Sequence, residues 1–313
     1  MKVASRLLSS AVVLLVVSML LFVMCRATPV SPARLTLGSD ANASQIMAFN
    51  HQFGLDRPVP AQYGSWLRGA ISLDFGNSYV TGQPIGSQIA STLPITVELV
   101  SFSFIFTVAI SIFIGTAAAL KENSFTDHLL RGVAIIGLSV PSFWLGLLLI
   151  RYIALKTGWF PVGGFTAWGD GVGDHLLGLV LPVLTMSVYY IAVLSRLVRA
   201  NMVTALSQDY IRTAQALGLS RSRIRVYALK NALPSLVSTA AMSYGYMFGW
   251  ALIIEQIFNI PGVSRALLTA IFQRDYPTVQ AIVLVITVIF IACNTCADIV
   301  YGYLDPKANQ NDR

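Results

Sequence analysis

Six apolar stretches, each about as long as a bilayer is thick, constrain the fold of this chain more than any other feature. They cover residues 7–25, 99–120, 132–150, 176–195, 235–257 and 279–301. A helix needs about 20 apolar residues to cross the hydrocarbon core, and backbone groups in lipid must find their hydrogen bonds within the segment. We therefore expect an all-α polytopic membrane protein with six transmembrane helices.

The composition agrees with this expectation. Hydrophobic residues make up 55% of the 313 residues, charged residues make up 11%, and the mean hydropathy is +0.68. Disordered chains are poor in apolar residues and rich in charge, so intrinsic disorder is excluded. The 21 basic and 14 acidic residues are too few to cover a soluble domain of this size.

The net charge of +7 could suggest a nucleic-acid partner, but its distribution argues otherwise. If the N-terminus is cytoplasmic, the inside segments carry a net +8 and the outside segments a net charge of zero. This asymmetry is the positive-inside bias of membrane proteins. We expect both termini in the cytoplasm and no nucleic-acid role. The first stretch is too long for a signal peptide and lacks a small-x-small cleavage site before Arg26, so we expect a retained helix.

Motifs for catalysis are absent from the sequence. No GxxxxGK[ST] phosphate loop occurs, so this chain should not bind or hydrolyse ATP by itself. No GxSxG or HExxH motif occurs either, and we assign no catalytic and no metal-binding residues. Cys293 and Cys296 form a CxxC pattern within the sixth stretch, where packing of small residues is the simpler interpretation.

The segment 196–234, between the fourth and fifth stretches, is longer than a simple turn requires. Tyr210, Ile211, Ala214 and Leu217 recur at helical spacing. Gly218 is expected to end that helix. Ser220 is expected to cap a second, basic helix, and Pro234 to open the fifth span. The basic helix could also lie on anionic lipid.

This segment resembles the coupling motif of permease subunits of bacterial ATP-binding-cassette (ABC) importers, in the oligopeptide, dipeptide and nickel branch. Ala214 and Gly218 match the motif, whereas Arg212 and Thr213 replace its glutamate and first alanine. Further runs similar to this branch follow in order along the chain: Asp74-Phe75-Gly76, Pro141-Ser142-Phe143-Trp144, Gly158-Trp159-Phe160-Pro161, Lys230-Asn231-Ala232-Leu233, Pro261-Gly262, Arg274-Asp275-Tyr276-Pro277 and Asp305-Pro306.

The resemblance implies an ABC type I importer permease fold in a bacterial plasma (inner) membrane. It also implies four partners besides the bilayer: a second homologous permease, two ATPase subunits and an extracytoplasmic substrate-binding protein. ATP and Mg²⁺ would be used by the ATPases, with no cofactor bound by this chain. The substrate stays open between di- or oligopeptides and nickel or other metal chelates. The residues implied in coupling to an ATPase are Asp209, Tyr210, Arg212, Thr213, Ala214, Ala216, Leu217, Gly218, Leu219 and Ser220.

We expect four parts along the chain. Residues 1–25 form the first transmembrane helix, and residues 26–98 form a small extracytoplasmic cap between helices 1 and 2. Residues 99–304 form a five-helix permease core that contains the coupling loop 196–234, and residues 305–313 form a cytoplasmic tail. The cap either docks the binding protein or is a passive loop.

Some residues inside the spans are candidates for the substrate pathway. They are Tyr244, Gly245, Gly249, Glu255 and Asp298. Helix packing is the alternative for the Gly245-x-x-x-Gly249 pattern, and pairing with an arginine or with backbone amides is the alternative for Asp298. Pro141 and Pro182 are expected to kink the third and fourth spans. Two other classes of protein are alternatives to a permease subunit. A secondary transporter would normally show inverted repeats, and a membrane-embedded enzyme would need clustered catalytic groups.

Overall fold

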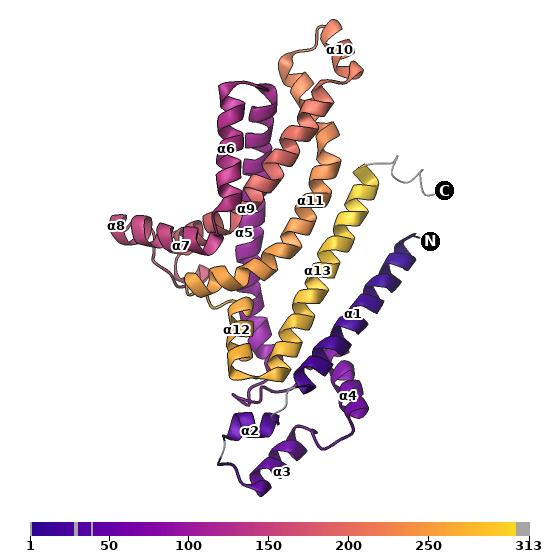
Figure 1. Cartoon of the computed structure of the whole chain (residues 1–313), viewed down its shortest axis with the longest axis vertical. Coiled ribbons are helices and arrows are strands. Elements are labelled where there is room, and N and C mark those ends of the chain that lie inside the picture. The colour runs from indigo at the N-terminus through magenta and orange to yellow at the C-terminus, as the bar shows by residue number, and fades with distance from the viewer. Residues whose placement is uncertain (1, 28–30, 39, 305–313) are drawn as a thin grey trace. The chain divides into compact units, whose positions relative to one another are not determined.

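A computed structural model describes residues 2–27, 31–38 and 40–304, and within these ranges it describes side chains from Leu8 to Ala297. The expected tail 305–313 lies outside the described residues. The described residues are mostly helical and include no β-strand, only an isolated bridge between Asn77 and Pro84 (Figure 1).

The helices follow one another with short connections. They are α1 (Lys2–Arg26), α2 (Pro32–Leu37), α3 (Ala43–Gln52), α4 (Val59–Ile71), α5 (Ile85–Leu120), α6 (Phe125–Ser139), α7 (Ser142–Leu149), the π-helical turn η1 (Ile150–Ala154), α8 (Leu155–Thr157), the 3₁₀ turn η2 (Trp168–Asp170), α9 (Val172–Leu206), α10 (Asp209–Ala216), α11 (Arg221–Ile257), α12 (Val263–Gln273) and α13 (Tyr276–Leu304).

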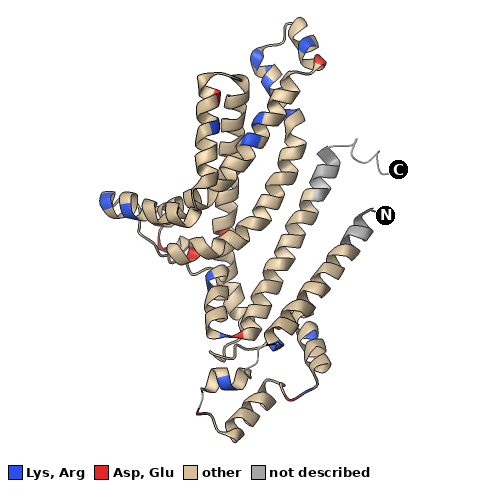
Figure 2. Ribbon diagram, viewed as in Figure 1, with Lys and Arg blue, Asp and Glu red and all other residues tan. Residues whose placement is uncertain are grey.

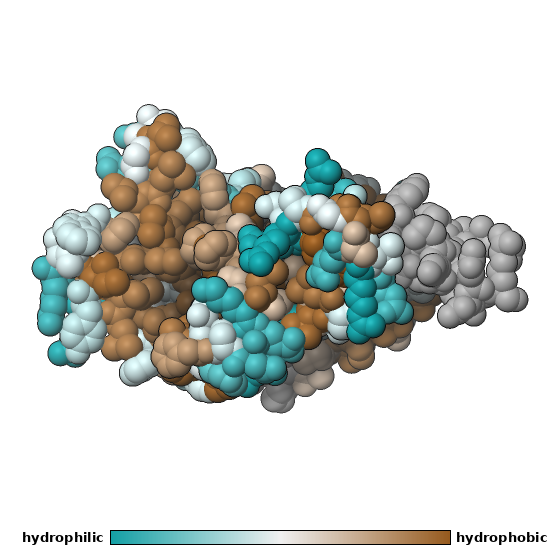
Figure 3. All heavy atoms as spheres, turned by 90° about the horizontal axis from the view of Figure 1, so that it is seen from above, coloured by the Kyte–Doolittle hydropathy of each residue, from teal (hydrophilic) through white to brown (hydrophobic). Residues whose placement is uncertain are grey.

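Five described helices are long and apolar enough to cross a membrane, and a bent pair of helices can supply a sixth span. The five are α1, α5, α9, α11 and α13. Large areas of hydrophobic side chains lie on the molecular surface (Figure 3). Phe113, Ile105 and Ile136 are 73%, 64% and 63% exposed, respectively. Such side chains suit contact with lipid, which confirms the expected class of all-α membrane protein.

The third expected span is a broken helix rather than a kinked one. α6 ends at Ser139, α7 begins at Ser142, and the direction of the chain changes by 99° between them. Val140 is extended, with φ −82° and ψ 120°. Proline disfavours helical geometry in the residue before it, so Pro141 accounts for the break. Pro182, by contrast, lies inside α9, which continues past it.

The fifth span also differs from the expectation. Pro234 does not open a new helix, because α11 runs without interruption from Arg221 to Ile257. The expected basic helix and the expected membrane span are therefore one element of 37 residues. Ala232 and Leu236 are buried on either side of the proline, and this packing holds the helix together where one backbone hydrogen bond is lost.

The chain divides into two compact units. The first comprises Met1–Thr96 and Pro261–Ile291, and the second comprises Val97–Ile260 and Ala292–Arg313. These units are defined by packing, whereas the four expected parts are defined by topology. The expected four-part division stays a prediction.

Aromatic rings and one carboxylate organise the first unit. Phe22 of α1 packs on Tyr63 and Trp66 of α4, with ring centroids 5.3 and 6.2 Å away. The carboxylate of Asp275 is almost fully buried and accepts hydrogen bonds from the Ser78 hydroxyl at 2.6 Å and the Tyr79 backbone N–H at 3.0 Å. Asp275 therefore joins the segment before α5 to the start of α13.

Small residues bring the helices of the second unit close together. A Cβ atom on Gly115 of α5 would lie 2.6 Å from the backbone oxygen of Ser195 of α9, so only glycine fits there. A Cβ on Gly137 of α6 would lie 3.3 Å from Val188 of α9. The Ser187 hydroxyl of α9 donates to the backbone oxygen of Ser103 in α5 at 3.1 Å. Small residues and interhelical hydrogen bonds are the usual means of helix association in lipid.

Candidate coupling site

The helix α10 and the turn that follows it contain the residues implied in coupling. Gln208 is extended and precedes the helix, and Asp209 places a negative charge in its first turn. Arg212 donates a hydrogen bond to Asp209 at 3.1 Å, in an i, i+3 ion pair that is largely exposed. A carboxylate near a helix N-terminus is favourable because it meets the positive end of the helix dipole.

The turn after α10 is a Schellman motif. The backbone N–H of Leu219 donates to the oxygen of Ala214 at 3.1 Å, and that of Gly218 donates to Gln215 at 3.0 Å. Gly218 has φ +75°, which L-residues with a side chain rarely adopt. The predicted helix end at Gly218 is thus confirmed. The predicted side-chain cap at Ser220 is wrong, because its backbone takes the N-cap conformation but its side chain makes no capping hydrogen bond.

One face of α10 is packed against its own chain. Ile211 is 1% exposed and Ala214 is 8% exposed, and both face inward. Ile211, with Leu219 beside it, belongs to a hydrophobic cluster formed mainly by α9 and α11, which includes Met202 and Ala228. α10 is therefore held to the two membrane helices that flank it in sequence.

The opposite face of α10 is exposed. The sequence placed Tyr210 and Leu217 on the same apolar face as Ile211, but Tyr210 is 40% exposed and Leu217 is 74% exposed. The Tyr210 hydroxyl accepts a hydrogen bond from the Asn231 amide of α11 at 3.0 Å. The other exposed implied residues are Asp209, Arg212, Thr213, Ala216, Gly218 and Ser220. An exposed leucine next to a glycine turn forms a small apolar projection that can enter a groove.

Basic residues gather beside this projection (Figure 2). Arg221, Arg223 and Arg225 all lie in the first turns of α11 and are exposed. The described part of the site thus combines an apolar tip with a positive flank. This arrangement fits either an acidic protein surface or an anionic lipid surface.

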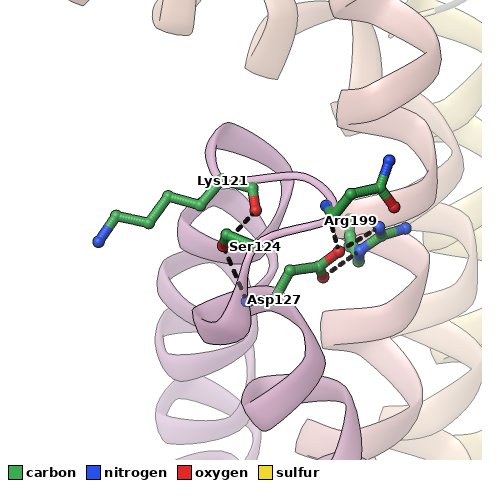
Figure 4. Close-up of polar contacts among 5 residues, drawn as sticks. Lys121, Ser124, Asp127 and Arg199 are labelled. Atoms are coloured by element: carbon green, nitrogen blue, oxygen red, sulfur yellow. Dashed lines mark hydrogen bonds and ion pairs between the residues drawn. The ribbon is translucent and has the colours of Figure 1, made fainter.

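An ion pair that the sequence did not reveal fixes the α5–α6 turn to α9 (Figure 4). Arg199 of α9 donates two hydrogen bonds to Asp127 of α6, each 2.6 Å long. The Asp127 side chain is fully buried and also accepts from the Asn123 backbone N–H at 3.1 Å. The Ser124 hydroxyl accepts a hydrogen bond from the Asp127 backbone N–H at 3.3 Å, capping α6. The Ser-x-x-Asp spacing signals this helix start in the sequence, but nothing there indicates Arg199.

The structure describes the surroundings of four of the five pathway candidates, and these four do not line one common hollow. Tyr244 shares a hydrogen bond with the Ser101 hydroxyl at 3.1 Å and lines an apolar hollow, whereas Gly249 lines a different hollow. Gly245 is buried, and Glu255 is fully buried. Asp298 lies in α13, but its side chain lies outside the described residues. A Cβ atom on Gly249 would meet nothing within 4 Å, whereas Gly245 is buried. Of the two glycines in the Gly245-x-x-x-Gly249 pattern, only Gly245 is therefore packed against other residues.

A buried histidine that the sequence did not single out connects the 158–171 segment to α5 and α9. His175 of α9 forms a 2.9 Å contact with the Glu98 carboxylate and a 2.6 Å contact with the Thr166 backbone oxygen. The Trp168 ring lies 4.0 Å from the His175 ring and donates its indole N–H to Glu98 at 2.7 Å. Contacts across 77 residues cannot be read from sequence spacing.

Comparisons with known proteins place this geometry in a family. Residues 111–310 match the family described as "Binding-protein-dependent transport system inner membrane component", and residues 2–100 match its N-terminal companion, "Binding-prot-dependent transport system membrane comp, N-term". A relative in Sinorhizobium fredii, named "Probable peptide ABC transporter permease protein", is 34% identical over 303 residues, which cover 96% of this chain and 97% of the relative.

Two further matches extend this result. The glutathione transport system permease protein GsiC of Escherichia coli K12 is 35% identical over 305 residues, which cover 97% of each chain. A chain in an inward-facing structure of the MetNI methionine ABC transporter has the same fold, with a TM-score of 0.58 and 14% identity over 69% of this chain and 96% of that one. These named relatives are transport permeases rather than enzymes. The chain therefore belongs to the binding-protein-dependent transport system inner membrane components, the permease subunits of ABC importers.

Proposed function

We propose that this permease imports peptides through the inner membrane and receives the force for transport through α10. Its relatives carry peptide and glutathione transport names, which favours di- and oligopeptides, including modified tripeptides, over nickel chelates. The partners would be a second homologous permease, two ATPase subunits and an extracytoplasmic binding protein. ATP and Mg²⁺ would be bound by the ATPases, and both termini of this chain would face the cytoplasm.

The two-faced packing of α10 is the observation that carries the coupling role. Its inner face, with Ile211 and Ala214 buried, holds it to α9 and α11, and its outer end exposes Leu217. A helix held in this way transmits a displacement of its tip to both membrane helices as a unit. Closure of an ATPase dimer around bound ATP would supply that displacement and drive the rocking of helices in the membrane.

Lipid contact alone explains the outer face of α10 less well. An interfacial helix lays its apolar face on the lipid and its basic face toward the headgroups. In α10 the two most buried apolar side chains, Ile211 and Ala214, point into the protein, and the large apolar side chains left exposed are Tyr210 and, directly after the helix, Leu217. The helix has one acid and one base, which pair with each other. A protein groove therefore suits its tip better than an anionic surface does.

The cap formed by α2, α3 and α4 suits docking of the binding protein. Ile71 and Leu73 are 77% and 75% exposed at the end of α4, and Leu73 has φ +59°. Exposed apolar side chains on a non-glycine left-handed turn leave an apolar surface that a partner can cover.

Reconstitution tests this function. The chain would be purified with its second permease and its ATPases, placed in liposomes, and supplied with the binding protein and with peptides or chelated nickel. We expect uptake of peptides that requires ATP hydrolysis and the binding protein. Uptake of nickel chelates without peptide uptake would overturn the substrate class, and peptide uptake without ATPases would overturn the importer class.

A further inference from the structure

The His175 side chain lies between two oxygen atoms, and this geometry determines how many hydrogens its ring contacts require. Nδ1 lies 2.6 Å from the backbone oxygen of Thr166, and Nε2 lies 2.9 Å from Oε1 of Glu98. A backbone oxygen can only accept a hydrogen bond, so Nδ1 must carry a hydrogen. A neutral imidazole has a hydrogen on one nitrogen only, so the contact with Glu98 needs a second one.

The second hydrogen can belong to either partner of the Glu98–His175 pair. Nε2 can carry it, so that an imidazolium donates to a carboxylate, or a neutral carboxylic acid can donate to Nε2. Trp168 does not supply it, because its indole N–H already donates to the same Oε1 at 2.7 Å. In both forms the pair holds one proton more than a neutral histidine with an ionised glutamate. Without that proton, two acceptor atoms would face each other at 2.9 Å.

The imidazole is closed off from water, which could otherwise replace a missing donor. The His175 side chain is 0% exposed and the Glu98 side chain 17% exposed. The rings of Phe165 and Trp168 cover the imidazole, with centroids 5.3 and 4.0 Å away. A buried acceptor without a donor costs free energy, so loss of the shared proton favours separation of the pair.

The other acids on the elements around His175 are exposed. Asp170 ends the turn η2, and Asp174 precedes His175 in α9. Within the described part of the chain, the ion-pair contact of His175 is the one with Glu98. The shared proton therefore decides whether the contact is attractive or repulsive.

The pair fastens the segment 158–171 to the helices around it. Thr166 and Trp168 both belong to this segment, and both bind the pair. At a second point, the Gly164 backbone N–H donates to the oxygen of Phe258, at the end of α11, at 2.8 Å. All of these residues belong to the second compact unit.

We propose that the Glu98–His175 pair is a proton-dependent latch that holds the segment 158–171 against α5, α9 and α11. The latch is fastened while the pair keeps its shared proton. When the pair loses this proton as the pH rises, the contact becomes repulsive and the segment is released. The stabilisation is therefore present at low pH and lost at high pH. The side of the membrane that sets this pH rests on the proposed orientation, whereas the latch itself does not.

Hydrogen exchange followed by mass spectrometry tests the latch in the whole transporter in lipid nanodiscs. Protection of the amides in 159–170, which include that of Gly164, would be measured from about pH 5 to about pH 9 and corrected for the intrinsic pH dependence of amide exchange. We expect this protection to fall by about tenfold as the pH rises, the equivalent of one buried hydrogen bond. Peptides from the middle of α9, around the buried Leu194, should keep their protection, which would show that the opening is local.

A pair of histidine variants identifies the group that titrates. His175→Gln removes the titrating ring, so the segment should exchange at the same corrected rate at every pH. His51→Gln is the matched control, because His51 is an exposed histidine of α3 in the first compact unit. It should keep the pH dependence of the wild type.

Glu98→Gln gives a result that a purely structural contact would not. Trp168 can only donate, so the new amide keeps its oxygen toward Trp168 and His175, and His175 still needs its second hydrogen. A neutral amide stabilises an imidazolium less than a carboxylate does, so release should move to lower pH by about one unit or more.

Any of four results would overturn the latch. Protection of the wild-type segment could stay constant across the pH range. His175→Gln could keep the pH dependence of the wild type, or His51→Gln could lose it, which would place the titrating group elsewhere. Glu98→Gln could lower protection equally at every pH without moving the release, which would make the pair a fixed structural contact.

Discussion

At the scale of single residues, Gly218 has the strictest backbone requirement in the candidate coupling site. Its φ of +75° closes the Schellman turn, and a Cβ atom there would meet nothing within 4 Å. The glycine is therefore required for its backbone conformation and not for space within the chain. Left-handed geometry costs roughly 1–2 kcal/mol for an ordinary L-residue, and asparagine tolerates it better than most.

Replacing Gly218 tests whether its left-handed backbone conformation is required for transport. We expect Gly218→Val to abolish ATP-driven uptake while the protein stays in the membrane at normal abundance, because the turn would open and misdirect Leu217. Gly218→Asn is the matched control and should keep most of the uptake. Uptake assays with immunoblots of the membrane fraction check both. Normal transport by Gly218→Val would refute the assignment of the coupling turn.

The Asp127–Arg199 pair makes a second prediction at the same scale. Removing one partner of a buried ion pair leaves an uncompensated charge and costs about 3–5 kcal/mol. We expect Arg199→Ala to lower the thermal midpoint of the detergent-solubilised protein strongly. Arg199→Lys should lower it less, because lysine keeps the charge but loses the two-point geometry seen in the pair.

The double variant provides the control for that measurement. Asp127→Ala with Arg199→Ala removes both charges, so its loss should be smaller than the sum of the two single losses. Additive losses, or a wild-type midpoint for Arg199→Ala, would contradict the structural role of the pair.

At the scale of helices, the break before α7 and the continuity of α11 show that a proline alone does not determine whether a helix ends. Both Pro141 and Pro234 lie in apolar helical sequence, yet one ends a helix and the other is passed over. The difference lies in packing. Ala232 and Leu236 are buried in the core around Pro234, whereas Pro141 borders a cavity. Hydrophobic length in the sequence predicts that a span exists, but not its continuity.

Straightening the α6–α7 break gives an element-scale prediction. Pro141→Ala removes the restriction on Val140, so we expect the bend between the two helices to open and uptake to fall. Spin labels at the exposed Leu129 and Leu155 would report a longer distance between α6 and α8. Pro182→Ala, inside the unbroken α9, should change neither quantity. An unchanged distance in Pro141→Ala would show that packing, not proline, makes the bend.

At the scale of the whole chain, the sequence predicted most of the fold because lipid leaves few choices. Long apolar runs in lipid must be helices, and each run of about 20 apolar residues predicts one transmembrane span. The helix proposed to couple to the ATPase is predicted by a local signal, the helical spacing of Tyr210, Ile211 and Ala214 before Gly218. The division of that face into buried Ile211 and exposed Leu217 needs the positions of α9 and α11, which no local pattern contains.

The contacts that the sequence missed have a common cause. Asp127 and Arg199 are 72 residues apart, His175 and Glu98 are 77 apart, and Ser78 and Asp275 are 197 apart. No motif in the sequence links the two residues of a pair, and the packing of the folded chain determines which residue each one meets.

One measurement tests the central claim that α10 meets an ATPase subunit. A photoreactive p-benzoylphenylalanine would replace Leu217, which is 74% exposed, in the complex assembled with its own ATPases. Phe272 in α12, 78% exposed and expected on the outer side, serves as the matched control position. We predict a cross-link to the ATPase from position 217 that changes in yield when ATP is bound, and none from position 272. Cross-links from position 217 to lipid alone would contradict the account.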